Sequence, residues 1–144
     1  MRRITSTLLS LTIAGSLAGQ PITTWMAEAE LRQTFAGVAI DGVYVDGMKF
    51  TESYDDQGAL VYNDPLKEMT GRWSIVNRAF CTLYHGKVTG GCFKVARVSA
   101  NCFEFYFLAS TEQETARLES GRPSWTARGW NKKHPTTCDE KPVV

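Results

Sequence analysis

Residues 80–108 read FCTLYHGKVTGGCFKVARVSANCFEFYFL, and this stretch decides the fold class. Aromatic and β-branched residues are frequent in three runs, Phe80–His85, Cys92–Val98 and Cys102–Leu108, and such residues favour β-strands. Gly86-Lys87 separates the first two runs, and a second polar turn separates the others. Short strands joined by tight turns pair in antiparallel fashion, so the stretch predicts two consecutive β-hairpins.

The same alternation of short strands and turns extends toward both ends of the chain. The further strands expected are Gly37–Ile40, Gly42–Val45, Met48–Tyr54, Ala59–Tyr62, Gly71–Val76 and Ser124–Trp130. Asp41-Gly42, Asp46-Gly47 and Asp55–Gly58 are the expected turns between the first of them. Parallel βαβ units need long helical segments, and we expect none before residue 109. The predicted fold is therefore all-β, an antiparallel meander of about seven to nine short strands that forms a small barrel or half-barrel.

Alternation along the strands predicts which side chains form the core. Met48, Phe50 and the ring of Tyr54 share one face of their strand, whereas the residues between them include polar Lys49 and Thr51. Phe80 and Tyr84 oppose Phe93 and Val95 across the Gly86-Lys87 hairpin in the same way. We expect these aromatic residues to face the interior.

The strand Cys102–Leu108 differs because both of its faces are apolar. Phe103, Phe105 and Phe107 share one face, and Tyr106 and Leu108 lie on the other. A strand of this kind is expected to be covered on both sides. The candidate cover is Ser110–Ser120, which is predicted as either a short helix or a loop.

Four cysteines indicate two disulfides, because an even number in a small exported domain is typical of a disulfide framework. If Gly86-Lys87 is a two-residue hairpin turn, Cys81 and Cys92 lie directly opposite each other. We therefore predict Cys81–Cys92, which leaves Cys102–Cys138 to attach the C-terminal tail to the sheet.

The N-terminus has the pattern of a secretory signal peptide. Arg2 and Arg3 precede an apolar stretch that is too short to span a membrane, so no transmembrane segment is expected. Two sites fit the small-x-small cleavage rule, one after Ala29 and one after Ala18, and the first is preferred. The predicted organisation is a signal peptide over residues 1–29 and a single β domain over residues 30–144, located in the periplasm.

Length and charge restrict the classes of function. The chain has 144 residues with 16 Lys or Arg, 15 Asp or Glu and a formal net charge of +1. This near-neutral balance argues against a dedicated nucleic-acid binder. Residues 30–70 hold eight acids and three bases, and residues 71–144 hold eleven bases and six acids. The two halves could attract each other within one sheet, or they could form a bipolar surface that docks a partner.

Motifs that name a reaction were not found. The chain contains no P-loop, no G-x-G-x-x-G and no G-x-S-x-G. It also lacks the C-x-x-C and H-x(3–5)-H spacings of zinc sites, so no metal or cofactor is expected. His85 could act as a base in a small hydrolase, although a structural or solvent-exposed role is the simpler interpretation.

An aromatic and basic cluster near the C-terminus is the predicted binding region. Trp125 and Trp130 have opposite strand parity, so at most one of them can point inward from a regular strand. The outward one is the expected contact residue. The basic residues around them, which suit an anionic partner, are Arg122, Arg128, Lys132 and Lys133.

A further pattern runs through the middle of the chain. Residues 46–52 have the order D-G-x-x-F-x-E, an acidic glycine turn follows, and Gly71, Trp73 and Val76 precede Cys81 and Cys92. This order resembles small exported β-domain proteins of Gram-negative bacteria that have no assigned activity. The resemblance covers about half of the chain and implies an envelope setting.

The expected function is a non-catalytic periplasmic module that binds an envelope protein or an anionic glycan through the region of Trp130 and Arg128. An inhibitor or accessory subunit of a periplasmic enzyme, acting through the turn Asp55–Gly58, is the alternative. A small hydrolase that uses His85 is the third hypothesis.

Overall fold

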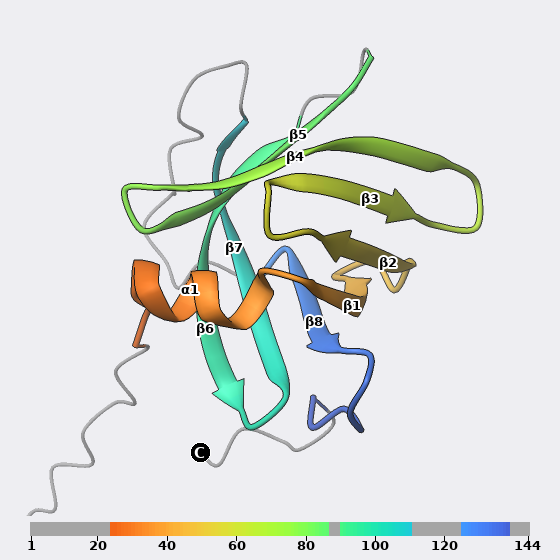
Figure 1. The fold of residues 1–144 in the computed structure, drawn as a ribbon. Helices are drawn as coiled ribbons and strands as arrows, with labels where there is room; N and C mark the ends of the chain where they lie inside the picture. Colours follow the sequence, from red (N-terminus) through yellow and green to blue (C-terminus); the bar gives the residue numbers. More distant parts are fainter. Residues whose placement is uncertain (1–23, 87–89, 111–124, 139–144) are drawn as a thin grey trace, which may run out of the picture.

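Eight antiparallel strands close into a barrel in which each strand pairs with the next and β8 returns to β1 (Figure 1). The structure is a computed structural model and describes residues 24–86, 90–110 and 125–138. The elements are α1 (Glu28–Phe35), β1 (Val38–Tyr44), β2 (Lys49–Tyr54), β3 (Ala59–Asn63), β4 (Glu68–Val76), β5 (Ala79–Tyr84), β6 (Gly91–Ser99), β7 (Cys102–Ser110) and β8 (Ala127–Asn131). The all-β prediction is confirmed, and the barrel is complete rather than half-formed.

Closure of the barrel gives every strand an inner and an outer face. In β2 the buried residues are Phe50, Glu52 and Tyr54, and they alternate with more exposed ones. The predicted core residues Phe80, Val95, Phe103 and Phe105 are all buried. The strand alternation in the sequence therefore identified the inner face correctly.

Helix α1 closes one end of the barrel. Leu31 and Phe35, one helical turn apart, are both fully buried. The Phe35 ring lies 5.0 Å from the ring of Phe80 and 5.3 Å from the ring of Phe103, measured between centroids. Figure 1 shows the helix lying across the mouth of the barrel. Helix α1, which has eight residues, is mostly polar and spans the expected cleavage site, was not predicted from the sequence; it is shorter than the helical segments that a parallel βαβ unit needs.

Asp41-Gly42 is not a turn, although the sequence predicts one there. Both residues lie in the middle of β1, where Asp41 pairs with Thr51 and Gly42 pairs with Phe50. A Cβ atom on Gly42 would lie 2.3 Å from Cζ of Phe50 and 2.8 Å from the carbonyl oxygen of Arg128. The glycine is thus required by the close approach of an aromatic ring and a neighbouring strand, which a local turn rule does not detect.

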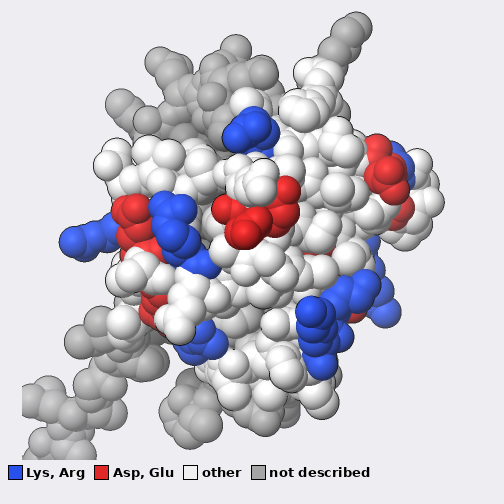
Figure 2. All heavy atoms as spheres, in the orientation of Figure 1, with Lys and Arg blue, Asp and Glu red and all other residues white. Residues whose placement is uncertain are grey.

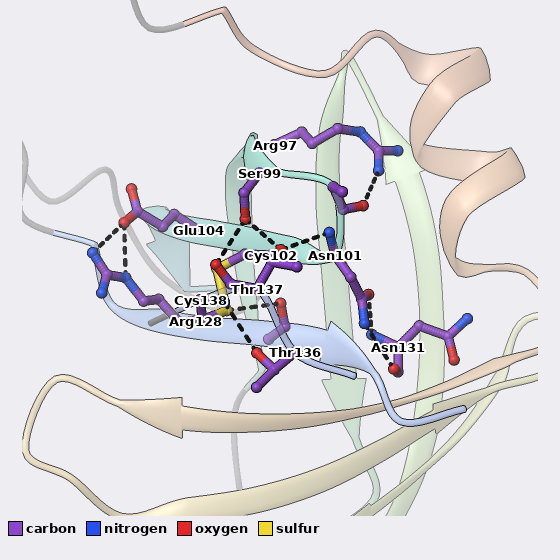
Figure 3. Close-up of a disulfide and its surroundings, with 12 residues drawn as sticks. Arg97, Ser99, Asn101, Cys102, Glu104, Arg128, Asn131, Thr136, Thr137 and Cys138 are labelled. Carbon is purple, nitrogen blue, oxygen red and sulfur yellow. Dashed lines mark hydrogen bonds and ion pairs between the residues drawn. A yellow bond between two sulfur atoms is a disulfide. The ribbon is translucent and has the colours of Figure 1, made fainter. Parts of the chain in front are cut away.

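Both predicted disulfides are present. Cys81 and Cys92 face each other on β5 and β6, with Cα atoms 4.0 Å apart. Cys102 and Cys138 have Cα atoms 4.9 Å apart and join the start of β7 to the C-terminal tail (Figure 3). Ser99 donates a hydrogen bond to the carbonyl oxygen of Thr137 at 3.0 Å, so the tail is also attached beside the bridge.

The N-terminal arm covers the outer face of the β6–β7 hairpin. Trp25 forms a β-bridge with Ala96, and the amide of Met26 donates a 2.9 Å hydrogen bond to the carbonyl of Val95. The rings of Trp25 and Tyr106 pack edge to face, with their centroids 5.1 Å apart. This arm supplies part of the cover that the apolar outer face of β7 required. Of the segment Ser110–Ser120, for which a covering role was predicted, Ser110 is the last residue of β7 and residues 111–120 lie outside the described ranges.

We predict that Gly42→Ala lowers the free energy of unfolding by about 1–3 kcal/mol, because the added methyl group overpacks the contact with Phe50. Urea denaturation followed by tryptophan fluorescence measures the effect. Ser74→Ala on β4 is the control, since Ser74 is exposed, and it should change stability by less than about 0.5 kcal/mol. Equal stabilities for the two variants would contradict this account of Gly42.

The N-terminal arm generates a second prediction, which also compares the two cleavage sites. A chain that lacks residues 1–29 loses Trp25 and Met26, whereas a chain that lacks residues 1–18 keeps both. Met26 is only 2% exposed, so its removal should cost about 1.5–3 kcal/mol of stability. Thermal unfolding of the two truncated chains tests this, and equal stability would show that the arm contributes little.

Candidate functional site

The predicted binding residues do not form one cluster. Arg128 points outward from β8 and pairs with Glu104 of β7, with its Nη2 atom 2.6 Å and its Nε atom 2.8 Å from the same carboxylate oxygen (Figure 3). The guanidinium also lies over the Trp125 ring, 4.5 Å from its centroid. Arg128 is thus already paired within the barrel wall and is less available to a partner than the sequence suggested.

Trp130 lies in a different environment, in the next outward position of β8. The strand register sets it opposite Asp41 of β1, Asp41 opposite Thr51 of β2, and Thr51 opposite Asn63 of β3. These four residues form a row across four neighbouring strands on the outside of the barrel, which we call the outer row. The prediction that one of the two tryptophans is outward-facing agrees with the position of Trp130.

The outer row lines an open groove of about 500 Å³. The groove is completed by Gly42, Lys49, Phe50, Asp64 and Pro65. Within it, the Thr51 hydroxyl donates a 2.7 Å hydrogen bond to Asp41 Oδ1. Lys132 Nζ lies 4.0 Å from the same oxygen. An indole ring therefore lies beside oriented hydrogen-bonding groups of both charges.

Asp64 remains negatively charged at the edge of this groove. Its Oδ1 atom accepts hydrogen bonds from the backbone amides of Leu66 and Lys67, at 2.8 and 3.0 Å. These bonds, that of Leu66 first, hold the pKa of the Asp64 carboxyl below its ordinary value. The Tyr62 hydroxyl donates a third hydrogen bond, to Oδ2 at 2.9 Å. The groove thus has a fixed acidic end.

The other predicted residues are more scattered. Lys133 is exposed in the segment after β8, and Arg122 lies outside the described residues. His85 is exposed after β5, where its Nδ1 atom lies 3.2 Å from the hydroxyl of Thr70. No group of three or more His, Cys, Asp or Glu side chains in the described ranges is placed to hold a metal ion.

The interior of the barrel holds a polar site that the sequence interpretation passed over. Glu52 lies between Phe50 and Tyr54 on the inward face of β2 and is only 6% exposed. The Tyr54 hydroxyl donates to its Oε2 atom at 2.7 Å, and the Tyr84 hydroxyl donates to its Oε1 atom at 2.6 Å. Desolvation raises the pKa of the Glu52 carboxyl, and the two tyrosine hydrogen bonds only partly oppose this shift.

Glu52 faces a small cavity, which we call the Glu52 cavity. It offers about 40 Å³ to the centres of water-sized molecules. Its lining is mostly aromatic and comprises Ile40, Tyr44, Phe50, Glu52, Tyr54, Phe80, Thr82, Tyr84, Phe93, Phe105 and Ala127. Burial raises the pKa of Tyr54 and Tyr84, so both hydroxyls stay protonated and act as donors to the carboxylate.

The alternation of inward and outward residues along β2 is the sequence feature from which this site could have been predicted. The alternation that assigns Phe50 and Tyr54 to the core also assigns Glu52 to it. A buried carboxylate is rare enough that its presence on a core face indicates a specific polar site.

Comparison of the chain with protein-family models, with curated proteins and with solved structures gives no match. The two sites built above, the outer groove and the Glu52 cavity, are therefore the basis for assigning a function.

We predict that the free energy of unfolding of Glu52→Gln rises relative to wild type with increasing pH. The folded-state pKa of Glu52 lies above the unfolded value of about 4.3, so the contribution of this side chain to stability is complete below that pH and is lost as pH rises through the folded pKa. Gln does not ionise and escapes this loss. Urea unfolding at several pH values between about 4 and 8 measures the difference.

Glu104→Gln is the matched control, because Glu104 is also buried but is paired with Arg128 on the outer face. At neutral pH the free energy of unfolding of Glu104→Gln should be about 1–3 kcal/mol lower than that of wild type, since the substitution removes the charged partner of Arg128. If the free energies of unfolding of Glu52→Gln and wild type differ by the same amount at every pH tested, the assignment of a raised pKa to Glu52 is contradicted.

Proposed function

We propose that this protein is a non-catalytic binding module that recognises an envelope glycan through the outer groove. One observation carries the proposal: the strand register places Trp130, Asp41, Thr51 and Asn63 in one row along an open groove. An aromatic ring offers a flat apolar surface for the C–H face of a sugar ring. Carboxylate, hydroxyl and amide groups at fixed spacing beside it suit sugar hydroxyl groups.

The charges around the groove are mixed: Asp41 and Asp64 belong to its lining, and two lysines beside them can pair with negative groups of a glycan. Lys49 lines the groove, Lys132 lies beside Asp41, and both lysines are exposed. Figure 2 shows acidic and basic side chains in small separate groups on the visible face, without one large patch of a single sign. Recognition would thus depend on local hydrogen bonds and stacking more than on long-range attraction. Of the two residues at the centre of the sequence-based proposal, Trp130 and Arg128, this proposal keeps Trp130 alone.

An exported, envelope-associated location is part of the same proposal. The two disulfides agree with folding in an oxidising compartment such as the periplasm. In the ranges that the structure covers, no helix has the length and apolar character of a membrane span. The expected signal peptide and the resemblance to exported β-domain proteins of Gram-negative bacteria point to the same setting.

Inhibition of an envelope enzyme is a second candidate, supported by the rigidity of the β2–β3 turn. Asp55 Oδ1 accepts hydrogen bonds from the amides of Gln57 and Ala59, at 2.9 and 2.7 Å. The Trp73 indole N–H donates to the Asp55 carbonyl at 2.8 Å. An exposed acidic turn held this way loses little conformational entropy on entering an enzyme cleft. Crosslinking in intact cells separates the candidates, because an inhibitor would give one discrete protein adduct.

The glycan proposal predicts that Trp130→Ala weakens binding about 30-fold, since a central aromatic contact contributes 2 kcal/mol or more. Stability should fall by no more than about 1–2 kcal/mol, because Trp130 faces outward and is only half-buried. An array of bacterial surface glycans, followed by calorimetry on those bound by wild type, provides the measurement.

Leu83→Ala is the matched control, as Leu83 is an exposed apolar residue on β5 away from the groove. It should bind like wild type. Unchanged glycan binding by Trp130→Ala, or a wild-type protein that binds none of the glycans, would rule out the outer groove as the glycan site.

A further inference from the structure

Glu52 is a buried acid without a basic partner. None of the ion pairs formed by the described residues involves Glu52, and its two hydrogen-bond partners are the neutral hydroxyls of Tyr54 and Tyr84. Glu104, the second buried acid among the described residues, is paired with Arg128. Burying a carboxylate without a counter-charge is costly, so Glu52 either takes up a proton or receives a cation from outside the chain.

The two tyrosines position the carboxylate without saturating it. Each carboxylate oxygen has about two lone-pair sites, and each accepts one tyrosine hydroxyl. One site per oxygen thus remains for another donor. Because Tyr54 and Tyr84 come from different strands, β2 and β5, they fix the carboxylate from two sides.

Aromatic residues supply most of the remaining wall of the cavity. Phe50, Phe80, Phe93 and Phe105 line it together with the rings of the tyrosines. The faces of aromatic rings carry negative electrostatic potential and attract organic cations. A carboxylate inside an aromatic enclosure is the combination that binds ammonium groups, whereas metal sites of hard cations gather several carboxylate or carbonyl oxygens, and Glu52 is the single carboxylate among the residues that line this cavity.

The size of the cavity limits the ligand. The space is about 40 Å³, and a water molecule needs about 10–15 Å³ on the same measure, so the cavity has room for about three or four heavy atoms. This is too small for a lipid or a nucleotide, which need several hundred Å³. Methylammonium and trimethylammonium fit this limit.

The residues that line the cavity are more exposed at the end of the barrel away from α1. Tyr44, Tyr84 and Phe93 line the cavity and are half-buried, whereas Phe35, Tyr54 and Phe80 at the α1 end are fully buried. A larger molecule could insert only an amine-bearing end into the cavity, past Tyr44, Tyr84 and Phe93.

We propose that the Glu52 cavity binds a small organic ammonium ion, with the Glu52 carboxylate as its counter-charge and the surrounding rings as its enclosure. This site is separate from the outer groove and does not depend on the glycan proposal. The raised pKa of the Glu52 carboxyl agrees with a charge that lacks its partner in the ligand-free protein.

The test is titration of the purified protein with trimethylammonium chloride against sodium chloride and potassium chloride at equal ionic strength. Wild type should show a rise in melting temperature specific to the ammonium salt. Glu52→Gln keeps the size of the side chain but removes its charge, and it should weaken the apparent affinity by about tenfold or more. Glu104→Gln is the matched control and should keep the response of wild type.

A second measurement does not depend on any variant folding. With ¹³C-labelled trimethylammonium, nuclear Overhauser effects should connect its methyl protons to the ring protons of Tyr44 and Phe93 in the wild-type protein. Contacts between the methyl protons and these rings, together with a loss of trimethylammonium affinity in Glu52→Gln but not in Glu104→Gln, would support the proposal. If Glu52→Gln does not fold, the ring contacts decide alone. Absent ring contacts, an equal response to all three salts, or equal loss in Glu52→Gln and Glu104→Gln would overturn it.

Discussion

The pairing of β1 with both β2 and β8 is the constraint on which the rest of the structure depends. Closure leaves no free edge, and it divides each strand into residues that face the core and residues that face outward. Glu52 and Trp130 belong to opposite sides of this division. The first is confined among aromatic rings, and the second lies in a groove that exists because four strands are held in one register.

Glu52 and Glu104, the two buried glutamates in the part of the chain that the structure describes, show how the same side chain is accommodated on either side of the barrel wall. Glu104 lies outside the barrel, where Arg128 neutralises it and the Tyr106 hydroxyl donates a hydrogen bond to it. Glu52 lies inside, where two tyrosine hydroxyls donate hydrogen bonds to it. These hydroxyls are neutral, so they do not balance the charge of the carboxylate. Pairing with a neighbouring cation makes Glu104 a structural group, whereas the unpaired charge of Glu52 makes it a candidate binding group.

Strand alternation and cysteine spacing predicted the fold class, the core face and both disulfides, because these follow from local periodicity and from one hairpin register. The break predicted at Asp41-Gly42 was wrong because the glycine there accommodates the ring of Phe50, a contact between strands. For the candidate site, strand parity predicted that at least one of Trp125 and Trp130 faces outward, but it predicted neither which one nor its neighbours. Asp41, Thr51 and Asn63 come together only through the registers of three strand pairs, which the sequence does not specify. The pairing of Arg128 with Glu104 was hidden for the same reason.

The attachment of the tail through Cys102–Cys138 has a consequence for the order of assembly. The strands that close the barrel, β1 and β8, are about 90 residues apart in the chain, and contacts of such long range form slowly. β8 lies between Cys102 and Cys138, so oxidation of this pair confines it to a loop that is closed over a sequence separation of 36 residues and begins at β7. The search for the closing partner is then reduced to the approach of β1 toward a strand already held near its final place. We therefore expect the Cys102–Cys138 disulfide to shorten the conformational search during folding as well as to stabilise the folded barrel.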